Sequence, residues 1–303
     1  MSEILHQTFI SLHPDELYIY DKYSFVTDTR KFKSRSLLNL QNNHHKNRLS
    51  DKSKQKVKRA VKYLLYYTTE KTAYNYKTQS RFKFKLNFLT LTLSSKQIHT
   101  DNEIKSGLLN QFFVECRKKW GITNYIWKAE KQVNGNVHFH IICDKFIPWN
   151  ELRQTWNRIQ NKYGYIDQFY LKYHHRNPNS TDIHSLKKVN NPAAYILKYI
   201  SKDLKDQDLK GRIWSCSYNL TKLSGATVEM DETIMKEINR LEQFADSKRI
   251  NKDYFSGIFF NNKRLSHESF PVLFDLMSEY IKKIFPNPQY TIWNDYSPPS
   301  GHE

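Results

Sequence analysis

Residues 123–143 read TNYIWKAEKQVNGNVHFHIIC, and this stretch decides the central part of the fold. Two runs rich in aromatic and β-branched residues flank an Asn-Gly-Asn triplet at 134–136. Asparagine followed by glycine between two such runs is a strong signal for a β-hairpin. The sequence therefore predicts two antiparallel strands, one over residues 123–132 and one over residues 137–143.

The second predicted strand carries the triplet His138-Phe139-His140. Residues two apart on a strand project to the same face of a sheet, so His138 and His140 present two imidazoles side by side. A two-residue turn would place Glu130 opposite Phe139, on the wrong face, whereas a three-residue loop at 134–136 places Glu130 opposite His140. Cross-strand neighbours on one face have β-carbons about 5 Å apart. We therefore predict the three-residue loop or an equivalent bulge.

This arrangement predicts a metal site of Glu130, His138 and His140. Paired imidazoles suit a borderline divalent ion, and a carboxylate beside them extends the choice to Mg²⁺ or Mn²⁺. A His-x-His triplet by itself is more often structural than metal-binding. Likewise, Glu130 could be an exposed strand carboxylate that pairs with Lys128 or Lys131.

Outside the hairpin, hydrophobic periodicity predicts further elements on both sides. Alternating residues at 81–93 indicate a strand, and apolar residues at helical spacing over 101–120 indicate an amphipathic helix that Gly121 ends. On the C-terminal side, we expect a helix over 149–163 and a strand over 165–173. The predicted order β-α-β-β-α-β indicates an α+β fold, a central antiparallel β-sheet with helices on one face.

The predicted sheet lies between two flanks, which gives three parts with boundaries 1–80, 81–218 and 219–303. The first is a basic N-terminal flank, with an amphipathic helix predicted over 46–62. The third is a helical and aromatic C-terminal extension, with a helix predicted over 231–245. We expect both flanks to be mainly helical.

The composition indicates a partner and a compartment. Lys and Arg number 48 against 30 Asp and Glu, a formal charge of +18, which predicts attraction to polyanions. The three cysteines are far apart and form no Cys-x-x-Cys pair, so a reducing compartment is expected. We find no signal pattern and no apolar run of the roughly 20 residues that cross a bilayer. We therefore expect a cytoplasmic protein without a membrane partner.

A second motif follows the hairpin at residues 193–204, where we predict a helix. Tyr195 and Tyr199 are four apart and share a helical face, and Lys198 and Lys202 repeat the same spacing. A phenol titrates near pH ~10, so a tyrosine nucleophile needs help, and a nearby ammonium supplies it. The alternative is a core helix with two aromatic anchors.

In order along the chain, FLTLTL at 88–93, HFH at 138–140 and YILKYISK at 195–202 resemble the three motifs of HUH endonucleases. These enzymes initiate rolling-circle replication. The double-tyrosine helix is most similar to replication initiators of small single-stranded DNA phages and related plasmids. The resemblance covers about residues 82–205, so it makes 81–218 an HUH endonuclease domain.

The resemblance implies a site and a reaction. It implies that a tyrosine attacks one phosphodiester of single-stranded or extruded origin DNA, keeps the 5′ phosphate as an ester, and leaves a 3′ hydroxyl that primes a polymerase. The same site would then rejoin ends to release a circle. A host helicase would separate the strands, because the sequence has no Gly-x-x-x-x-Gly-Lys-Ser/Thr loop. The implied metal ligands are His138, His140 and Glu130, and the implied catalytic residues are Tyr195, Tyr199, Lys198 and Lys202.

Two other functions fit parts of the same pattern. A mobilisation relaxase or transposase of the same superfamily also uses a histidine pair and one or two tyrosines. The histidines here precede the tyrosines, which favours a replication initiator. A non-enzymatic, RRM-like nucleic-acid-binding protein would share the element order, the charge and the aromatic residues, but it would not need the histidines or the tyrosine helix.

Overall fold

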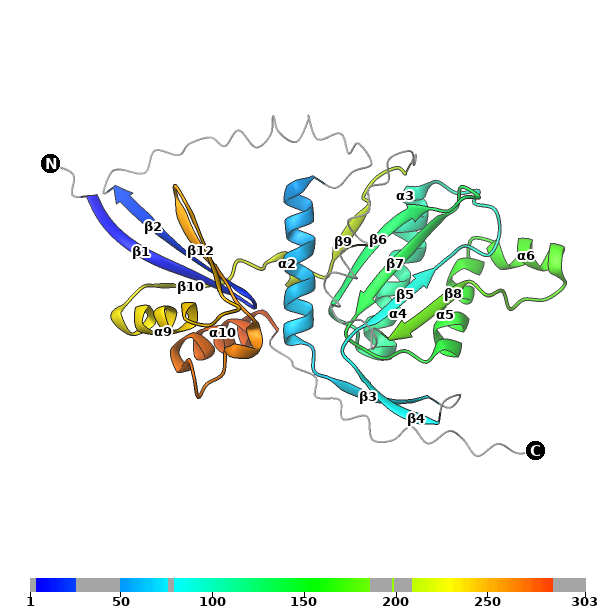
Figure 1. Ribbon diagram of the computed structural model, residues 1–303. Coiled ribbons are helices and arrows are strands. Elements are labelled where there is room, and N and C mark those ends of the chain that lie inside the picture. Colours follow the sequence, from blue (N-terminus) through cyan, green and yellow to red (C-terminus); the bar gives the residue numbers. More distant parts are fainter. Residues whose placement is uncertain (1–3, 26–49, 76–78, 186–197, 199–208, 286–303) are drawn as a thin grey trace. The chain divides into compact units, whose positions relative to one another are not determined.

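The computed structural model describes residues 4–25, 50–75, 79–185, 198 and 209–285 (Figure 1). The chain forms two compact units. The first unit holds residues 1–5 and 23–223, and the second holds residues 6–22 and 224–303. The N-terminal strands thus belong with the C-terminal part of the chain.

The first unit contains a five-stranded sheet in the order β8-β5-β7-β6-β9, and neighbouring strands in it run antiparallel. A small second sheet pairs β3 with β4. The elements of this unit are α2 (Asp51–Tyr67), β3 (Lys71–Asn75), β4 (Ser80–Phe84), β5 (Asn87–Leu91), α3 (Asp101–Glu103), the π-helix η1 (Ile104–Leu109), α4 (Asn110–Trp120), β6 (Tyr125–Lys131), β7 (Val137–Cys143), α5 (Trp149–Asn161), α6 (Tyr165–Tyr173), β8 (Thr181–Ser185), β9 (Trp214–Cys216) and α8 (Tyr218–Thr221).

One face of the five-stranded sheet is the core of this unit. Leu89, Phe139 and Ile141 point from β5 and β7 into a cluster that α4 and α5 complete, and α4 and α5 lie on the same side of the sheet in Figure 1. Phe112 of α4 and Trp156 of α5 meet there edge to face. The predicted α+β fold with an antiparallel sheet is therefore confirmed.

Local signals explain several element boundaries. Gly121 ends α4 in the left-handed conformation with φ 62°, a conformation that glycine adopts without a steric penalty. Ser50 caps α2 by accepting a hydrogen bond from the backbone N–H of Ser53. The helix predicted over 46–62 is present as α2, and it buries an apolar stripe that includes Val61 and Leu64.

The strand predicted over 165–173 is wrong, because this segment is the helix α6. Its aromatic residues sit at i and i+4, and the rings of Phe169 and Tyr173 lie 4.5 Å apart, which is a helical pairing. The fourth strand of the pattern is instead β8, in a stretch predicted as a polar loop. Backbone pairing with β5 makes β8 a strand, although its sequence alone lacks a strong strand signal.

The strand predicted over 81–93 is divided into β4 and β5, which belong to different sheets. β4 pairs with β3, whereas β5 pairs with β7 and β8. Alternation of polar and apolar residues continues across the break at Lys85 and Leu86, so the pattern does not reveal that the chain changes sheets.

The second unit contains another five-stranded sheet, in the order β10-β1-β2-β12-β11. The expectation of mainly helical flanks is therefore wrong, since strands from both ends of the chain form this sheet. Strands separated by more than 200 residues complete each other here, a pairing that local periodicity does not predict. The elements of this unit are β1 (Ile4–His13), β2 (Glu16–Phe25), β10 (Ala226–Glu229), α9 (Glu232–Glu242), β11 (Lys248–Lys252), β12 (Phe255–Phe259), the 3-10 helix η2 (Asn262–Arg264) and α10 (Pro271–Ile284).

Helix α9 is the helix predicted over 231–245, and Asp231 caps it by accepting from the N–H of Ile234. Its buried Glu237 accepts hydrogen bonds from two backbone N–H groups at the start of α10. Among the described residues, no helix is long and apolar enough to cross a membrane.

Candidate metal site on the histidine face

The face of the first sheet opposite its core carries polar side chains from three neighbouring strands. We call it the histidine face and define it by Phe88, Thr90, Lys128, Glu130, His138 and His140. Alternation along the strands places these residues on the side away from Leu89 and Phe139, because successive side chains of a strand point to opposite faces.

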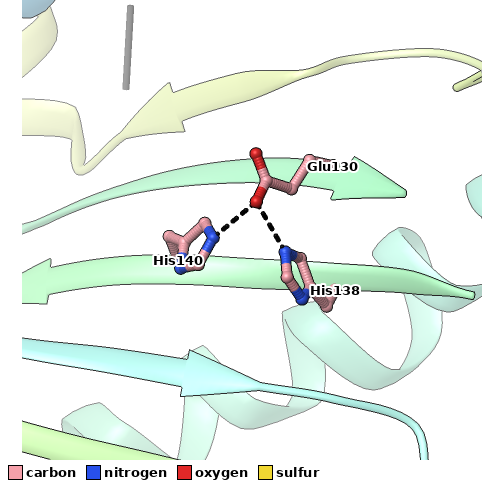
Figure 2. Close-up of side chains that lie close together, drawn as sticks. All are labelled: Glu130, His138 and His140. Carbon is pink, nitrogen blue, oxygen red and sulfur yellow. Dashed lines mark hydrogen bonds and ion pairs between the residues drawn. The ribbon is translucent and has the colours of Figure 1, made fainter. Parts of the chain in front are cut away.

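Three of these side chains converge on one point. Oε1 of Glu130 lies 2.8 Å from Nε2 of His138 and 2.8 Å from Nε2 of His140 (Figure 2). One ligand atom from each residue falls within 4.8 Å of the other two, so the group could hold a metal ion. The three side chains are only 12–20% exposed, which shields the site from bulk water.

The register that produces this convergence differs from the predicted register by two residues. Glu130 pairs with His138, and Lys128 pairs with His140, whereas we expected Glu130 opposite His140. The three-residue loop is at 133–135 rather than 134–136, and the N–H of Gln132 donates to the carbonyl of Asn136 to close it. A shift of two residues keeps every side chain on its face, so the predicted placement of Glu130 on the side of the histidines is confirmed.

The loop of this hairpin is fixed by contacts outside it. The amide oxygen of Asn136 accepts from the N–H of Gln97, and its amide nitrogen donates to the carbonyl of Ser95. On the adjoining strand, Lys131 donates to the buried carboxylate of Asp101 at 2.6 Å. These bonds hold the two strands in one register, on which the position of the three ligand atoms depends.

The electrostatics of the site favour an ionised carboxylate. Burial alone would raise the pKa of Glu130, but hydrogen bonds from His138 and His140 outweigh burial and hold that pKa far below its ordinary value of 4.5. The amine of Lys128, whose side chain is almost completely buried, lies 3.8 Å from the other carboxylate oxygen. Glu130 is therefore an anion at neutral pH and can serve as a ligand.

Neighbouring residues orient one of the two imidazoles. The hydroxyl of Thr90 lies 3.3 Å from Nδ1 of His140, and the ring of Phe88 lies 5.3 Å from the ring of His140. A hydroxyl can donate or accept, so Thr90 can partner either tautomer of His140. By contrast, Nδ1 of His138 is buried without a hydrogen-bond partner in the part of the chain that the structure describes.

This donor set fits a divalent metal ion. Two imidazole nitrogens and one carboxylate oxygen are ligands for divalent transition metals and leave further coordination positions for water or substrate. The contact from Thr90 resembles the outer hydrogen bonds that fix the ring of a ligating histidine. The chemistry of the residues therefore supports the metal site, and it leaves the identity of the ion open.

The predicted catalytic residues of the tyrosine helix have a different status. Tyr195, Tyr199 and Lys202 lie outside the described residues, so their roles stay predictions. Lys198 is described; its backbone is helical and its side chain is exposed. The structure instead adds Lys128 to the metal ligands as a neighbour. Its position two residues before Glu130 is the sequence signal that could have placed it on this face.

Residues 86–204 match the family model for the replication-associated protein ORF2. The matched segment includes β5, β6, β7 and β8, and thus all residues of the histidine face. No curated protein matches the chain. The match supports a role as a replication initiator and, with it, binding to DNA.

Proposed function

We propose that this protein is an HUH-type, two-tyrosine replication initiator that nicks one DNA strand at an origin and later rejoins the ends. The observation that carries this proposal is the convergence of Glu130, His138 and His140 within a segment that matches a replication-associated family. A metal-dependent site-specific endonuclease and strand transferase accounts for both features. The ligand set and the phosphodiester substrate favour Mg²⁺ or Mn²⁺ as the ion.

In the proposed reaction, the hydroxyl oxygen of Tyr195 or Tyr199 attacks a phosphorus atom of single-stranded DNA. A bond forms between the tyrosine oxygen and phosphorus, the bond to the 3′ oxygen breaks, and the phenol proton ends on the leaving 3′ hydroxyl. The 5′ phosphate stays on the protein as a phosphotyrosine ester. Rejoining is the same exchange in reverse, so it needs no external energy source.

Each group near the reaction has a proposed task. The ammonium groups of Lys198 and Lys202 lower the cost of ionising the neighbouring tyrosines and attract the scissile phosphate. Glu130, His138 and His140 would hold the metal ion, which when bound polarises the phosphodiester. Two tyrosines four residues apart allow a second cleavage while the first ester persists, and this second cleavage releases a unit-length circle.

The decisive experiment is covalent capture of DNA. The full chain is incubated with an origin-derived single-stranded oligonucleotide and Mn²⁺, and any adduct is resolved on a denaturing gel and weighed by mass spectrometry. The parent should form an adduct, each single Tyr→Phe variant at 195 or 199 should retain part of it, and the double variant should form none. As a matched control, Tyr170→Phe on α6 should leave the adduct unchanged.

The outcomes separate the proposed function from its alternatives. An undiminished adduct in the Tyr195→Phe/Tyr199→Phe double variant refutes the tyrosine assignment. Binding without any adduct or nick in the parent, with every origin strand tested, would instead identify a non-enzymatic nucleic-acid-binding protein. Nicking at a transfer origin but not at a replication origin would identify a mobilisation relaxase.

A further inference from the structure

The sheet of the second unit has one apolar face and one aromatic face. Ile10, Leu12, Leu17 and Ile258 are completely buried, and they alternate along β1, β2 and β12 with partly exposed aromatic residues. Pairing of Gly257 with Tyr18 and of Ile258 with Leu17 fixes which residues share a face. We define the aromatic face by Phe9, Tyr18, Tyr20, Phe255 and Phe259.

The rings of the aromatic face form a connected set across three strands. Tyr18 of β2 meets Phe255 and Phe259 of β12 edge to face, with ring centroids 5.6 and 6.4 Å apart. On the other side, the ring of Phe9 stacks with the ring of Tyr20 at 6.3 Å. Phe255 is 40% exposed, a large exposure for a phenylalanine on the face of a sheet.

Positive charge accompanies these rings. The amine of Lys22 lies 4.1 Å above the ring of Phe9 and 5.7 Å from the ring of Tyr20. Lys248 and Lys252 of β11 pair with Phe259 and Phe255, so they share the face, and both are exposed.

The acidic residues of this face lie away from β11 and β12, whose sequences, KRINK and FSGIF, hold no acidic residue. Glu229 on β10 accepts hydrogen bonds from Gln7, and Glu16 is buried. The side of the aromatic face formed by β2, β12 and β11 is therefore complementary to an anion.

We propose that the aromatic face binds single-stranded DNA, as a nucleic-acid contact in addition to the histidine face. Unpaired bases stack on exposed rings without regard to sequence, while lysines beside the rings contact phosphates. Antiparallel sheets with aromatic residues on one face bind single strands in this way. The choice of DNA over RNA rests on the proposed function, whereas the stacking chemistry is common to both. A protein partner would not need alternating rings and lysines.

Photo-crosslinking locates the contact directly. The full chain is mixed with an oligothymidine of about 20 nucleotides, a length that exceeds the site of a single binding face. In this probe 5-iododeoxyuridine replaces thymidine, and the mixture is irradiated without added metal. Crosslinked peptides are then identified by mass spectrometry. We expect peptides from β2 and β12, with Tyr20 or Phe255 as attachment points. An excess of unlabelled DNA should suppress them at lower concentration than RNA of the same length.

Substitutions measure the contribution of the rings. Tyr20→Leu with Phe255→Leu keeps apolar bulk but removes stacking, so affinity for the oligonucleotide should fall about tenfold or more. Phe274→Leu on α10 is the matched control and should leave affinity unchanged.

Substitutions of the lysines measure the contribution of charge. Lys248→Gln with Lys252→Gln should flatten the dependence of log affinity on log salt by about 0.7 for each phosphate that the protein no longer neutralises. Lys282→Gln with Lys283→Gln on α10 makes the same change of charge away from the face and should leave the slope unchanged.

The proposal and the proposed function fail in different ways. Crosslinks confined to residues 50–223, or equal affinity of the parent and the leucine double variant, would overturn the aromatic face as a binding surface and would leave covalent capture unaffected. A protein crosslinked in place of the oligonucleotide would point to a protein partner instead. Should the leucine double variant unfold in a thermal scan, the crosslink map of the parent decides the matter alone.

Discussion

The histidine face and the aromatic face arise from the same backbone arrangement, a five-stranded sheet with one buried face. On the first sheet, the second face gathers a carboxylate, two imidazoles and a buried amine around one point. On the second sheet, the corresponding face spreads flat rings and exposed lysines over three strands and a neighbouring edge.

The difference teaches what kind of partner each face can select. A converging set of ligand atoms binds one ion at one position, and small displacements weaken it. A distributed set of rings and amines binds an extended chain, and loss of one member weakens it only in part. Changes to the two faces should therefore have different signatures.

The largest expected effect is on metal binding by the histidine face. His138→Ala with His140→Ala removes two of three ligands, so affinity for Mn²⁺ should fall by more than about a thousandfold, below detection in calorimetry. Affinity for an oligonucleotide should change little, because it rests on distributed charge. His267→Ala in the second unit is the control. Retained Mn²⁺ binding in the double variant would place the ion elsewhere.

The next effect comes from the carboxylate. Glu130→Gln keeps the shape of the side chain and removes its negative charge, so Mn²⁺ affinity should fall about a hundredfold, since ligand charge sets affinity for such ions. The same calorimetric titration measures it. Glu229→Gln on the second sheet should change nothing, and an equal loss there would mean that binding follows overall charge rather than the three converging ligands.

A smaller effect should follow from Thr90. Thr90→Val removes the hydroxyl that contacts Nδ1 of His140 and should lower Mn²⁺ affinity about tenfold, the range found for partners of ligating histidines. Thr92→Val is a close control two residues further along the chain, because the hydroxyl of Thr92 donates to the carbonyl of Ser180 and to no metal ligand. Equal effects of the two substitutions would contradict a positioning role for Thr90.

The smallest effect is a pH-dependent change of stability without metal. Since the folded pKa of Glu130 lies below its ordinary value of 4.5, ionised Glu130 stabilises the fold above pH 4.5, and this contribution is lost as the pH falls below it. The parent should exceed Glu130→Gln by about 1–2 kcal/mol at about pH 7 in chelator, and the difference should shrink toward about pH 3. Glu232→Gln, at an exposed ion pair, serves as the control in urea unfolding. A difference that grows on acidification would reverse the assigned direction.

The metal ligands could be predicted from the sequence because their geometry is local. The triplet at 138–140 places two imidazoles on one face by strand periodicity, and the nearby turn returns Glu130 to the same face. The prediction missed the register by two residues, an error that a period of two conceals. Thr90 and Lys128 were not assigned contacts, because these depend on which strands become neighbours.

The second sheet was not predicted for a related physical reason. β1 and β2 at the start of the chain are completed by β10, β11 and β12 near its end, and no local pattern specifies a partner across such a distance. Similarly, β8 became a strand through pairing with β5, while the aromatic spacing in 165–173 formed a helix.

The sequence by itself determined the antiparallel hairpin, its paired imidazoles and the polyanion-attracting charge, because strand periodicity, turn residues and composition act over short distances or over the whole chain. Tertiary structure decided the convergence of three ligand atoms at one point and the assembly of a sheet from both ends of the chain. Both depend on the pairing of strands from separate segments, which burial of the whole core selects.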